Sequence, residues 1–168
     1  MNNDKRSFEV FFDEYYDEVR RALAVALADP VLAEDAAQEA FARAYAQWRS
    51  VSVMERPAGW VYVVALRGGR RQRGRRIEPP APGPEPDPIG NFLDREELEP
   101  MLLRLPERQR VAVVLRYLAD LPLADVAAAM GCAVGTVKST LHAALSRLRI
   151  ELNDVEAMDE EWMSDAAG

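Results

Sequence analysis

Residues 79–88 read PPAPGPEPDP, and six of these ten positions are proline. Proline lacks the backbone N–H that a helix needs, and its ring favours extended polyproline geometry, so no helix can cross this stretch. We therefore expect residues 77–92 to be a linker that divides the chain into two domains. Sixteen residues at about 3.1 Å each span roughly 50 Å, which would let the two domains contact separated places on one partner.

The segment before the linker, residues 1–76, has apolar residues at helical spacing and no alternation typical of a strand. Residues 7–28 and 31–49 each carry one apolar stripe, which predicts two helices. A third helix should start near Pro57, because proline fits the first turn of a helix. The pair Gly68-Gly69 costs that helix about 1 kcal/mol per glycine relative to alanine, which favours a bend or fraying there.

The segment after the linker, residues 93–152, ends in a helix-turn-helix pattern. Residues 123–130 form a short amphipathic stretch, and Gly131 permits the left-handed turn that ends it. Residues 137–148 carry the next apolar stripe, opposite a polar and basic face. We therefore expect an all-α fold of two small helical domains, the C-terminal one a helix-turn-helix.

The charged residues are segregated along the chain. The formal net charge is −7 at pH 7, which taken alone argues against a polyanionic partner. Residues 61–76, however, hold six basic and no acidic residues, and residues 101–150 hold seven basic and three acidic ones. Because local potential decides where a polyanion docks, both segments are candidates for binding nucleic acid. Residues 153–168 form an acidic tail that we expect to be mobile.

Other classes of protein find little support in the sequence. Cys132 has no second cysteine for a disulfide, and with His142 it gives too few ligands for zinc, so no metal or other cofactor is expected. The apolar run at 22–28 is far shorter than the roughly 20 residues of a membrane span, which predicts a cytoplasmic protein with no membrane contact. Acidic neighbours such as Glu34 and Asp35 point apart on a helix, and no phosphate loop or paired nucleophile and base is visible, so we do not expect an enzyme.

Three blocks of sequence, in this order, resemble a known family. They are AEDAAQEAFARAYAQW at 33–48, PAGWVYVVALRGGRRQRGRR at 57–76 and LPERQRVAVVLRYLADLPLADVAAAMGCAVGTVKSTLHAALSRLR at 105–149. Together they resemble the bacterial RNA polymerase sigma factors of the extracytoplasmic-function (ECF) group, actinobacterial type. The resemblance implies a non-catalytic protein that binds RNA polymerase core, recognises a bipartite promoter and directs transcription initiation. An anti-sigma factor is implied as a further partner.

For the first block, the resemblance implies a docking surface for the clamp helices of the largest polymerase subunit. The residues that match this surface are Asp35, Gln38, Glu39, Ala42 and Arg43. Without the resemblance, they read as the solvated face of a helix. The resemblance also implies that the helix at 108–118 helps to dock on the flap of the second-largest subunit, although its residues alone indicate only a buried core.

The second block joins aromatic residues to a run of arginines. Holding a displaced DNA strand needs aromatic faces, which stack on bases at about 1–3 kcal/mol each, and cations that follow the phosphates. The resemblance implies that this block recognises the melted promoter element. The candidate residues are Trp60, Tyr62, Arg67, Arg70, Arg71 and Arg73. Core packing is the alternative for both aromatic residues, whereas the arginines would repel one another unless an anion lies near.

For the third block, the resemblance implies that the last helix of the helix-turn-helix enters the major groove of the more distant promoter element. Residues near its N-terminal end would meet base edges and phosphates, and later ones would contact phosphates. These candidates are Thr136, Lys138, Ser139 and Thr140, followed by His142 and Arg147. Relatives often place a capping residue where Ala133 stands and an arginine where Ala143 stands, so the preference for a promoter sequence is expected to differ or to be looser.

Two alternatives involve no polymerase. A conventional helix-turn-helix regulator would account for residues 105–149, but it leaves the basic segment at 61–76 and the rest of the first domain without a role. A helical protein-interaction module without a DNA role is opposed by both basic segments. A sigma factor accounts for all of these segments with one hypothesis.

Overall fold

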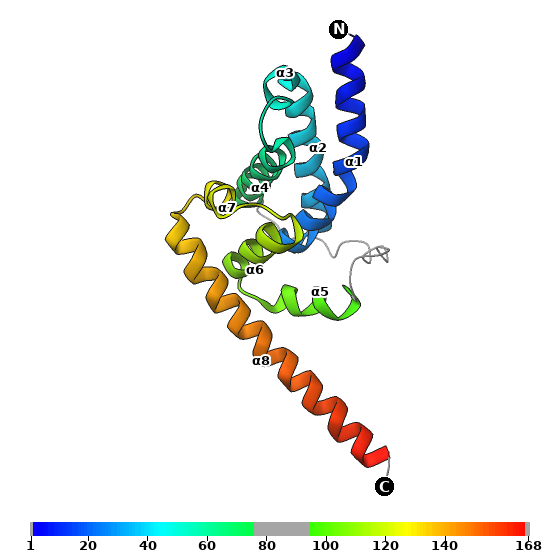
Figure 1. Ribbon diagram of the computed structural model, residues 1–168, viewed down its shortest axis with the longest axis vertical. Coiled ribbons are helices and arrows are strands. Elements are labelled where there is room, and N and C mark those ends of the chain that lie inside the picture. Colours follow the sequence, from blue (N-terminus) through cyan, green and yellow to red (C-terminus); the bar gives the residue numbers. More distant parts are fainter. Residues whose placement is uncertain (1, 76–94, 167–168) are drawn as a thin grey trace.

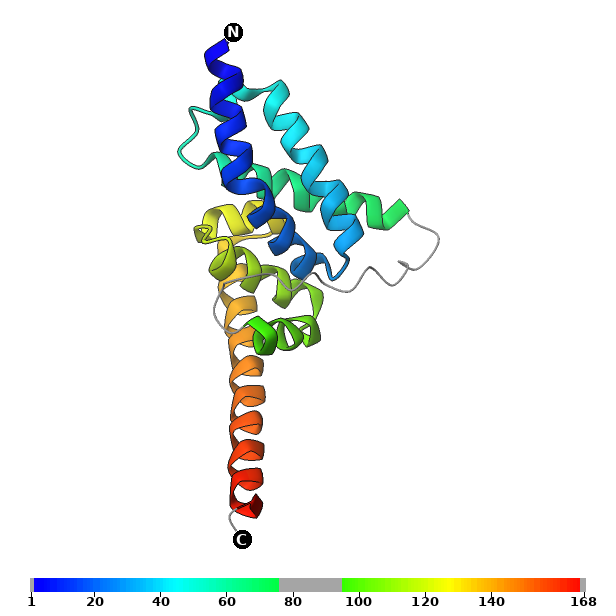
Figure 2. The same ribbon diagram turned by 90° about the vertical axis from the view of Figure 1, so that its right-hand side faces the viewer.

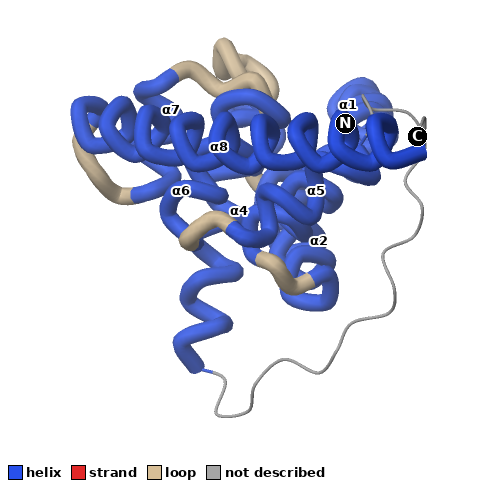
Figure 3. The backbone as a smooth tube through the Cα atoms, turned by 90° about the horizontal axis from the view of Figure 1, so that it is seen from below, coloured by secondary structure: helices blue, strands red, loops and turns tan. Residues whose placement is uncertain are grey.

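The computed structural model describes residues 2–75 and 95–166, with side chains described over 4–74 and 98–150. Every regular element within these residues is a helix, which confirms the all-α prediction (Figure 3). The expected linker at 77–92 lies outside the described residues.

Residues 2–75 form what we call the N-terminal unit. Its helices are α1 (Asn2–Leu27), α2 (Pro30–Ala46), α3 (Trp48–Val51) and α4 (Pro57–Arg75). Helices α1 and α2 lie alongside each other, and α4 packs across both (Figure 2). The break predicted between the first two helices is present, since α1 ends at Leu27 and α2 begins at Pro30. The Asp29 side chain caps α2 by accepting a hydrogen bond from the Leu32 amide at 2.9 Å.

Aromatic side chains join the first half of α1 to α2 and α3. The ring of Phe11 lies 4.9 Å from Trp48 and 5.7 Å from Phe41, measured between centroids. Phe12 meets Phe41 edge-on at 5.3 Å. Tilted and edge-on pairs at these separations add stability beyond the burial of apolar area. This cluster fixes the angle between α1 and α2 and so holds the outer face of α2 in place.

Residues 95–166 form the C-terminal unit. Its helices are α5 (Arg95–Arg104), α6 (Glu107–Val113), the π-helical turn η1 (Val114–Leu118), α7 (Leu123–Met130) and α8 (Val134–Ala166). Gly131 has φ 66°, and its left-handed conformation ends α7 as expected for a helix-turn-helix. Helix α8 runs away from the rest of the molecule (Figure 1), and residues 153–166 of the expected mobile tail continue this helix.

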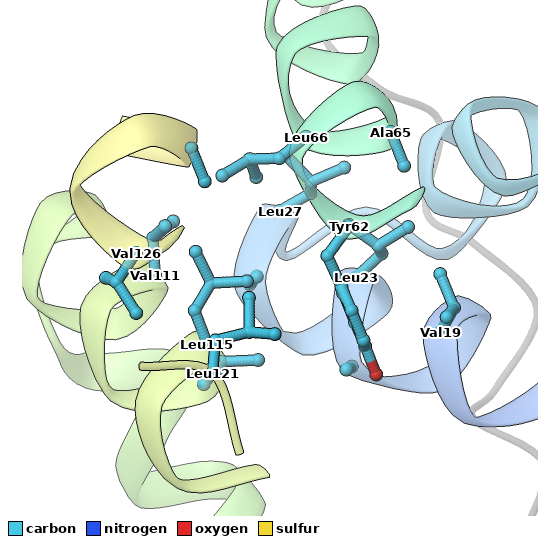
Figure 4. Close-up of a cluster of buried hydrophobic side chains, with 14 of the residues drawn as sticks. Val19, Leu23, Leu27, Tyr62, Ala65, Leu66, Val111, Leu115, Leu121 and Val126 are labelled. Carbon is cyan, nitrogen blue, oxygen red and sulfur yellow. The ribbon is translucent and has the colours of Figure 1, made fainter. Parts of the chain in front are cut away.

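The two units share one hydrophobic core. Figure 4 shows side chains of α1 and α4 facing those of α6, η1 and α7 across the boundary between the units. Leu27, Leu66 and Leu115 meet in this core, and each is at most 1% exposed. Its other members include Leu23, Val111, Leu121 and Val126. In this arrangement the C-terminal unit is therefore packed against the N-terminal unit over an apolar surface.

Helix α4 continues without interruption to Arg75, so the fraying predicted at the glycine pair is wrong, and the bend stays a prediction. A Cβ atom on Gly69 would lie 2.9 Å from Cδ1 of Leu27, whereas one on Gly68 would meet nothing within 4 Å. Gly69 thus allows α4 to approach α1 closely, and the packing gained there offsets the low helix propensity of glycine.

Candidate nucleic-acid interface

The outer face of α2 brings together the five residues predicted to dock on polymerase. Four of them are exposed and Glu39 is half-buried, because the opposite face of α2 is buried in the core. Glu39 is held by two partners, Arg43 on the same helix and Gln72 of α4, whose Nε2 donates to Oε2 at 3.3 Å. The five residues are Asp35, Gln38, Glu39, Ala42 and Arg43, at positions i, i+3, i+4, i+7 and i+8.

Three predicted arginines of α4 lie on the face that meets the C-terminal unit. Arg67 donates from Nη2 to the carbonyl oxygen of Ala128 at 2.6 Å. Ala128 is the third residue from the C-terminal end of α7. Arg73 pairs with Oε1 of Glu107 at 3.2 Å, and Nε of Arg70 lies 3.9 Å from the same oxygen. For Arg70 and Arg73, the nearby anion is therefore the carboxylate of Glu107 in the C-terminal unit.

Two further hydrogen bonds from arginines reach the C-terminal end of α1. Arg73 also donates to the carbonyl oxygen of Leu27. Arg110 of α6, only 7% exposed, donates from Nε to Ala26 at 3.1 Å and from Nη1 to Leu105 at 3.0 Å. The last turn of α1 has no basic residue of its own, so distant arginines satisfy its carbonyl groups. Burial lowers the pKa of the Arg110 guanidinium, while the nearby Glu107 carboxylate acts in the opposite direction.

The two aromatic candidates differ in their surroundings. Tyr62 is 1% exposed, and its hydroxyl lies 3.5 Å from Oε1 of Glu18. The predicted contact between Tyr62 and a DNA strand does not fit this position, because the ring is enclosed by the core and cannot stack on a base. Trp60 is only partly buried, and Arg71 is exposed.

The N-terminal part of α8 presents to solvent the face predicted to contact duplex DNA, which we call the reading face. It carries Thr136, Lys138, Ser139, Thr140, His142 and Arg147. Val137, Leu141 and Leu148 hold the helix to the core from the opposite side. Two side-chain hydroxyls on the reading face donate back to the carbonyl oxygen of Thr136, at 3.0 Å from Ser139 and 2.7 Å from Thr140. Their oxygens can still accept hydrogen bonds from a ligand. Thr136, Lys138, Ser139, His142 and Arg147 are exposed, and Thr140 is half-buried.

Neither a metal centre nor a membrane span is found where the structure describes the chain. Over residues 4–74 and 98–150, where side chains are described, no cluster of three or more His, Cys, Asp or Glu side chains could hold a metal ion. No helix in these ranges combines the length and apolar character that crossing a membrane requires. Three surfaces therefore remain as candidate binding sites. They are the outer face of α2, the reading face of α8, and the face of α4 that carries Arg67, Arg70 and Arg73, which we call the arginine face.

Comparison with known proteins decides between a sigma factor and the alternatives. Residues 95–148 match the family model described as sigma-70, region 4. The chain is 34% identical over 164 residues to the RNA polymerase sigma-E factor of Streptomyces coelicolor, covering 92% of this chain and 93% of that relative. It is 31% identical over 138 residues to the ECF RNA polymerase sigma factor SigL of Mycobacterium tuberculosis, covering 76% and 78%. The chain belongs to the ECF family of RNA polymerase sigma factors.

The solved structures agree with this assignment. This sigma factor is similar to RpoE of Bartonella quintana, determined in complex with the anti-sigma factor NepR, with a TM-score of 0.67 and 25% identity. The match covers 88% of this chain and 98% of that one. The predicted family and function are confirmed: the protein is an alternative sigma factor that directs transcription initiation by RNA polymerase.

Two residues whose side chains join the two units of this sigma factor were not predicted from its sequence. Glu107 and Arg110 lie in a block that read as core and turn, far along the chain from α4. The only signal in the sequence was the surplus of cations at 61–76, which requires an anion but does not say which one. The pairing depends on how the two units pack, and helical periodicity does not encode that.

Proposed function

We propose that this sigma factor divides transcription initiation among three surfaces. The outer face of α2 docks on the clamp helices of the largest subunit of RNA polymerase core. Helix α4 holds the melted promoter element, and the N-terminal part of α8 enters the major groove of the more distant element. In terms of the chain, 1–76 acts as the docking and strand-binding domain, 77–92 as the linker, 93–152 as the duplex-reading domain and 153–168 as an acidic tail.

The observation that carries the proposal is the exposed reading face of α8, which begins directly after the left-handed Gly131. A helix that enters the major groove needs an accessible N-terminal end and a firmly held opposite face. Thr136 and Lys138 are exposed near that end, while Val137 between them is fully buried. Lys138 and Arg147 supply cations for the phosphates on either side of the groove.

The assignment of α2 to polymerase rests on its accessible face. Asp35, Gln38 and Arg43 are exposed, and the ion pair of Arg43 with Glu39 lies within α2 itself. Among the described residues, the contact of this face with another helix that is given is the hydrogen bond of Glu39 with Gln72 of α4, whereas a docking role explains the mixed charges of the whole face. The helix at 108–118 would add the contact with the flap of the second-largest subunit, through exposed residues such as Tyr117, which is 56% exposed.

On α4, the strand-binding set is Trp60 with Arg67, Arg70, Arg71 and Arg73. Tyr62 is left out, because its side chain is 1% exposed. Trp60 would stack on a base, and the arginines would pair with phosphates of the displaced strand. Only Arg71 among these arginines is exposed without an assigned contact to the C-terminal unit, so the others must exchange their present partners for DNA.

The protein itself performs no chemistry in this proposal, since RNA polymerase makes the phosphodiester bonds in the cytoplasm. RpoE of Bartonella quintana was determined with an anti-sigma factor, and we extend a partner of this kind to the present chain. Capture of the tagged chain from resting cells of its host should recover such a binder. Recovery of polymerase alone would argue against it.

Transcription in vitro tests the proposed function. The purified chain is added to sigma-free bacterial core polymerase with genomic fragments of its host, and transcript starts are sequenced, with core alone as the control. We expect discrete starts, each preceded by the same two sequence elements. Binding to core without specific starts would contradict the assignment of the reading face. Binding to DNA without binding to core would instead favour the conventional helix-turn-helix regulator.

A further inference from the structure

Three of the four arginines that should hold the melted strand are in contact with other parts of the protein itself. Arg67 is bonded to the Ala128 carbonyl group, and Arg70 and Arg73 share the carboxylate of Glu107. These partners all belong to the C-terminal unit. Each guanidinium carries five N–H donors, so a phosphate group would compete with the carboxylate and the carbonyl oxygen for those donors that face the C-terminal unit.

The C-terminal unit covers this side of α4 along most of its length. Near the start of α4, a Cβ atom on Gly59 would lie 3.3 Å from Oδ2 of Asp125 and 3.4 Å from Cδ2 of Leu121. Near its end, Arg73 meets Glu107. At 1.5 Å per residue, these two points are about 21 Å apart along the helix. A single strand therefore cannot lie along this side of α4 while the units are packed together.

The contacts form two layers with different properties. Outside are the ion pairs with Glu107, whose three side chains are between 30% and 43% exposed. Inside is the apolar core in which Leu27, Leu66 and Leu115 are at most 1% exposed. Separating the units would expose this apolar surface to water, which disfavours the open form until another surface covers it. The ion pairs of Glu107 add modestly to the stability of the packed arrangement and fix how the C-terminal unit is aligned along α4.

We infer that the packed arrangement is an autoinhibited form in which the C-terminal unit masks the strand-binding face of α4, with Glu107 as the latch. The carboxylate of Glu107 and the DNA phosphates compete for Arg70 and Arg73, so opening on a promoter replaces one anion with another. This inference rests on the proposed function of α4. It adds that the free chain must open before its arginines can reach DNA.

Removing the latch tests the inference with the full-length chain. Glu107→Gln keeps the size of the side chain but removes the charge that Arg70 and Arg73 share. Binding of a fluorescent single-stranded DNA oligonucleotide is measured by anisotropy at constant salt. Because partly exposed ion pairs are modest, we expect about three- to tenfold tighter binding. The matched control is Asp120→Asn, which makes the same charge change at a residue whose side chain is 94% exposed.

The control preserves the backbone, because Asp120 has φ 52° and asparagine tolerates this left-handed conformation. Asp120→Asn should change the affinity for the oligonucleotide less than about twofold, as expected for a single fully solvated surface charge. Any gain that Glu107→Gln shows beyond this control measures the release of the arginines and excludes a general effect of net charge.

A second variant opens the interface sterically. Gly59→Glu places a longer, acidic side chain against Asp125 and Leu121, whereas Gly59→Ala asks those side chains to shift only slightly. An added carboxylate should by itself weaken binding to DNA. Tighter binding of the oligonucleotide by Gly59→Glu than by Gly59→Ala would therefore report opening of the interface. Far-UV circular dichroism and urea unfolding establish that each variant is folded.

The results separate this inference from the proposed function. The inference is overturned if Glu107→Gln gains no more affinity than Asp120→Asn and folded Gly59→Glu binds no tighter than Gly59→Ala. Specific initiation by the wild-type chain would stand in that case. If the wild-type chain never directs specific initiation, the proposed function fails, whatever the affinities of the variants for a single strand.

Discussion

Arg110 of α6 donates a hydrogen bond from Nε to the carbonyl oxygen of Ala26 at 3.1 Å, so a side chain of the C-terminal unit caps the first helix of the N-terminal unit. The guanidinium is 7% exposed and also holds Leu105 of its own unit. A buried cation is stable only when its donors are paired, and here backbone carbonyls from both units supply the acceptors. Arg110 therefore couples the stability of each unit to their packing.

Replacing Arg110 with methionine should destabilise the protein by about 2–3 kcal/mol, because the carbonyl groups of Ala26 and Leu105 lose their partner in a buried setting. Arg108→Met, at an exposed position of the same helix, is the matched control and should cost at most about 0.5 kcal/mol. Urea unfolding measures both free energies. Equal costs would show that the buried hydrogen bonds contribute nothing beyond the loss of a charge.

The two neighbouring glycines of α4 should respond in opposite ways to the same substitution. Gly68→Ala should stabilise the protein by about 0.5–1 kcal/mol, because alanine is the better helix former. Gly69→Ala should lose this gain and cost about 1 kcal/mol, because its Cβ would lie 2.9 Å from Leu27, which is 1% exposed and has little room to move. Thermal unfolding of the pair provides the comparison. Stabilisation by both substitutions would contradict the close approach of α4 to α1.

Helix α8 begins after Ala133, which has no side chain that could cap it. Ala133→Ser should stabilise the protein by about 0.5–2 kcal/mol, because the hydroxyl can accept a hydrogen bond from an amide of the first turn. Ala133→Val adds volume at the same exposed position without an acceptor, and it should give no such gain. Urea unfolding compares the two variants. A gain from valine as large as that from serine would rule out capping as the cause.

The docking face of α2 can be tested by reversing one charge. Asp35→Arg should weaken binding to RNA polymerase core by about tenfold or more, as a reversed charge within an interface brings both repulsion and a lost contact. Asp13→Arg makes the same charge change at an exposed position of α1 and should leave the affinity within about twofold. Competition with a labelled sigma factor for core gives both affinities. Equal losses would move the docking surface away from α2.

Helical periodicity was sufficient to predict the first two long helices and the helix-turn-helix, because each of these helices buries one stripe against the core. The helix expected at 7–28 is α1 (Asn2–Leu27), and the one expected at 31–49 became α2 and the single-turn α3. The same periodicity sorted the docking residues of α2 onto one exposed face, since residues 3 and 4 apart share a side of a helix. Local patterns of this kind need no knowledge of distant partners.

The arginine face could not be predicted in the same way, because its geometry depends on contacts between distant segments. Gly69 was read as a weakness of α4, yet its lack of a side chain admits Leu27. Tyr62 and Trp60 lie two positions apart on one helix, and only the packing of α1 shows that Tyr62 is enclosed. The pairing of Arg73 with Glu107 joins residues that are 34 positions apart.

The distance between the two units during initiation tests the central claim most directly. Donor and acceptor dyes are attached at Ser50→Cys and Ala124→Cys, two exposed positions of α3 and α7, in a chain whose own Cys132 is replaced by alanine. We expect high energy transfer in the free chain and a clear drop when core polymerase and a promoter found in the transcription assay are added. Unchanged energy transfer in a complex that initiates transcription would show that the packed units act together on DNA, and would contradict the autoinhibited form.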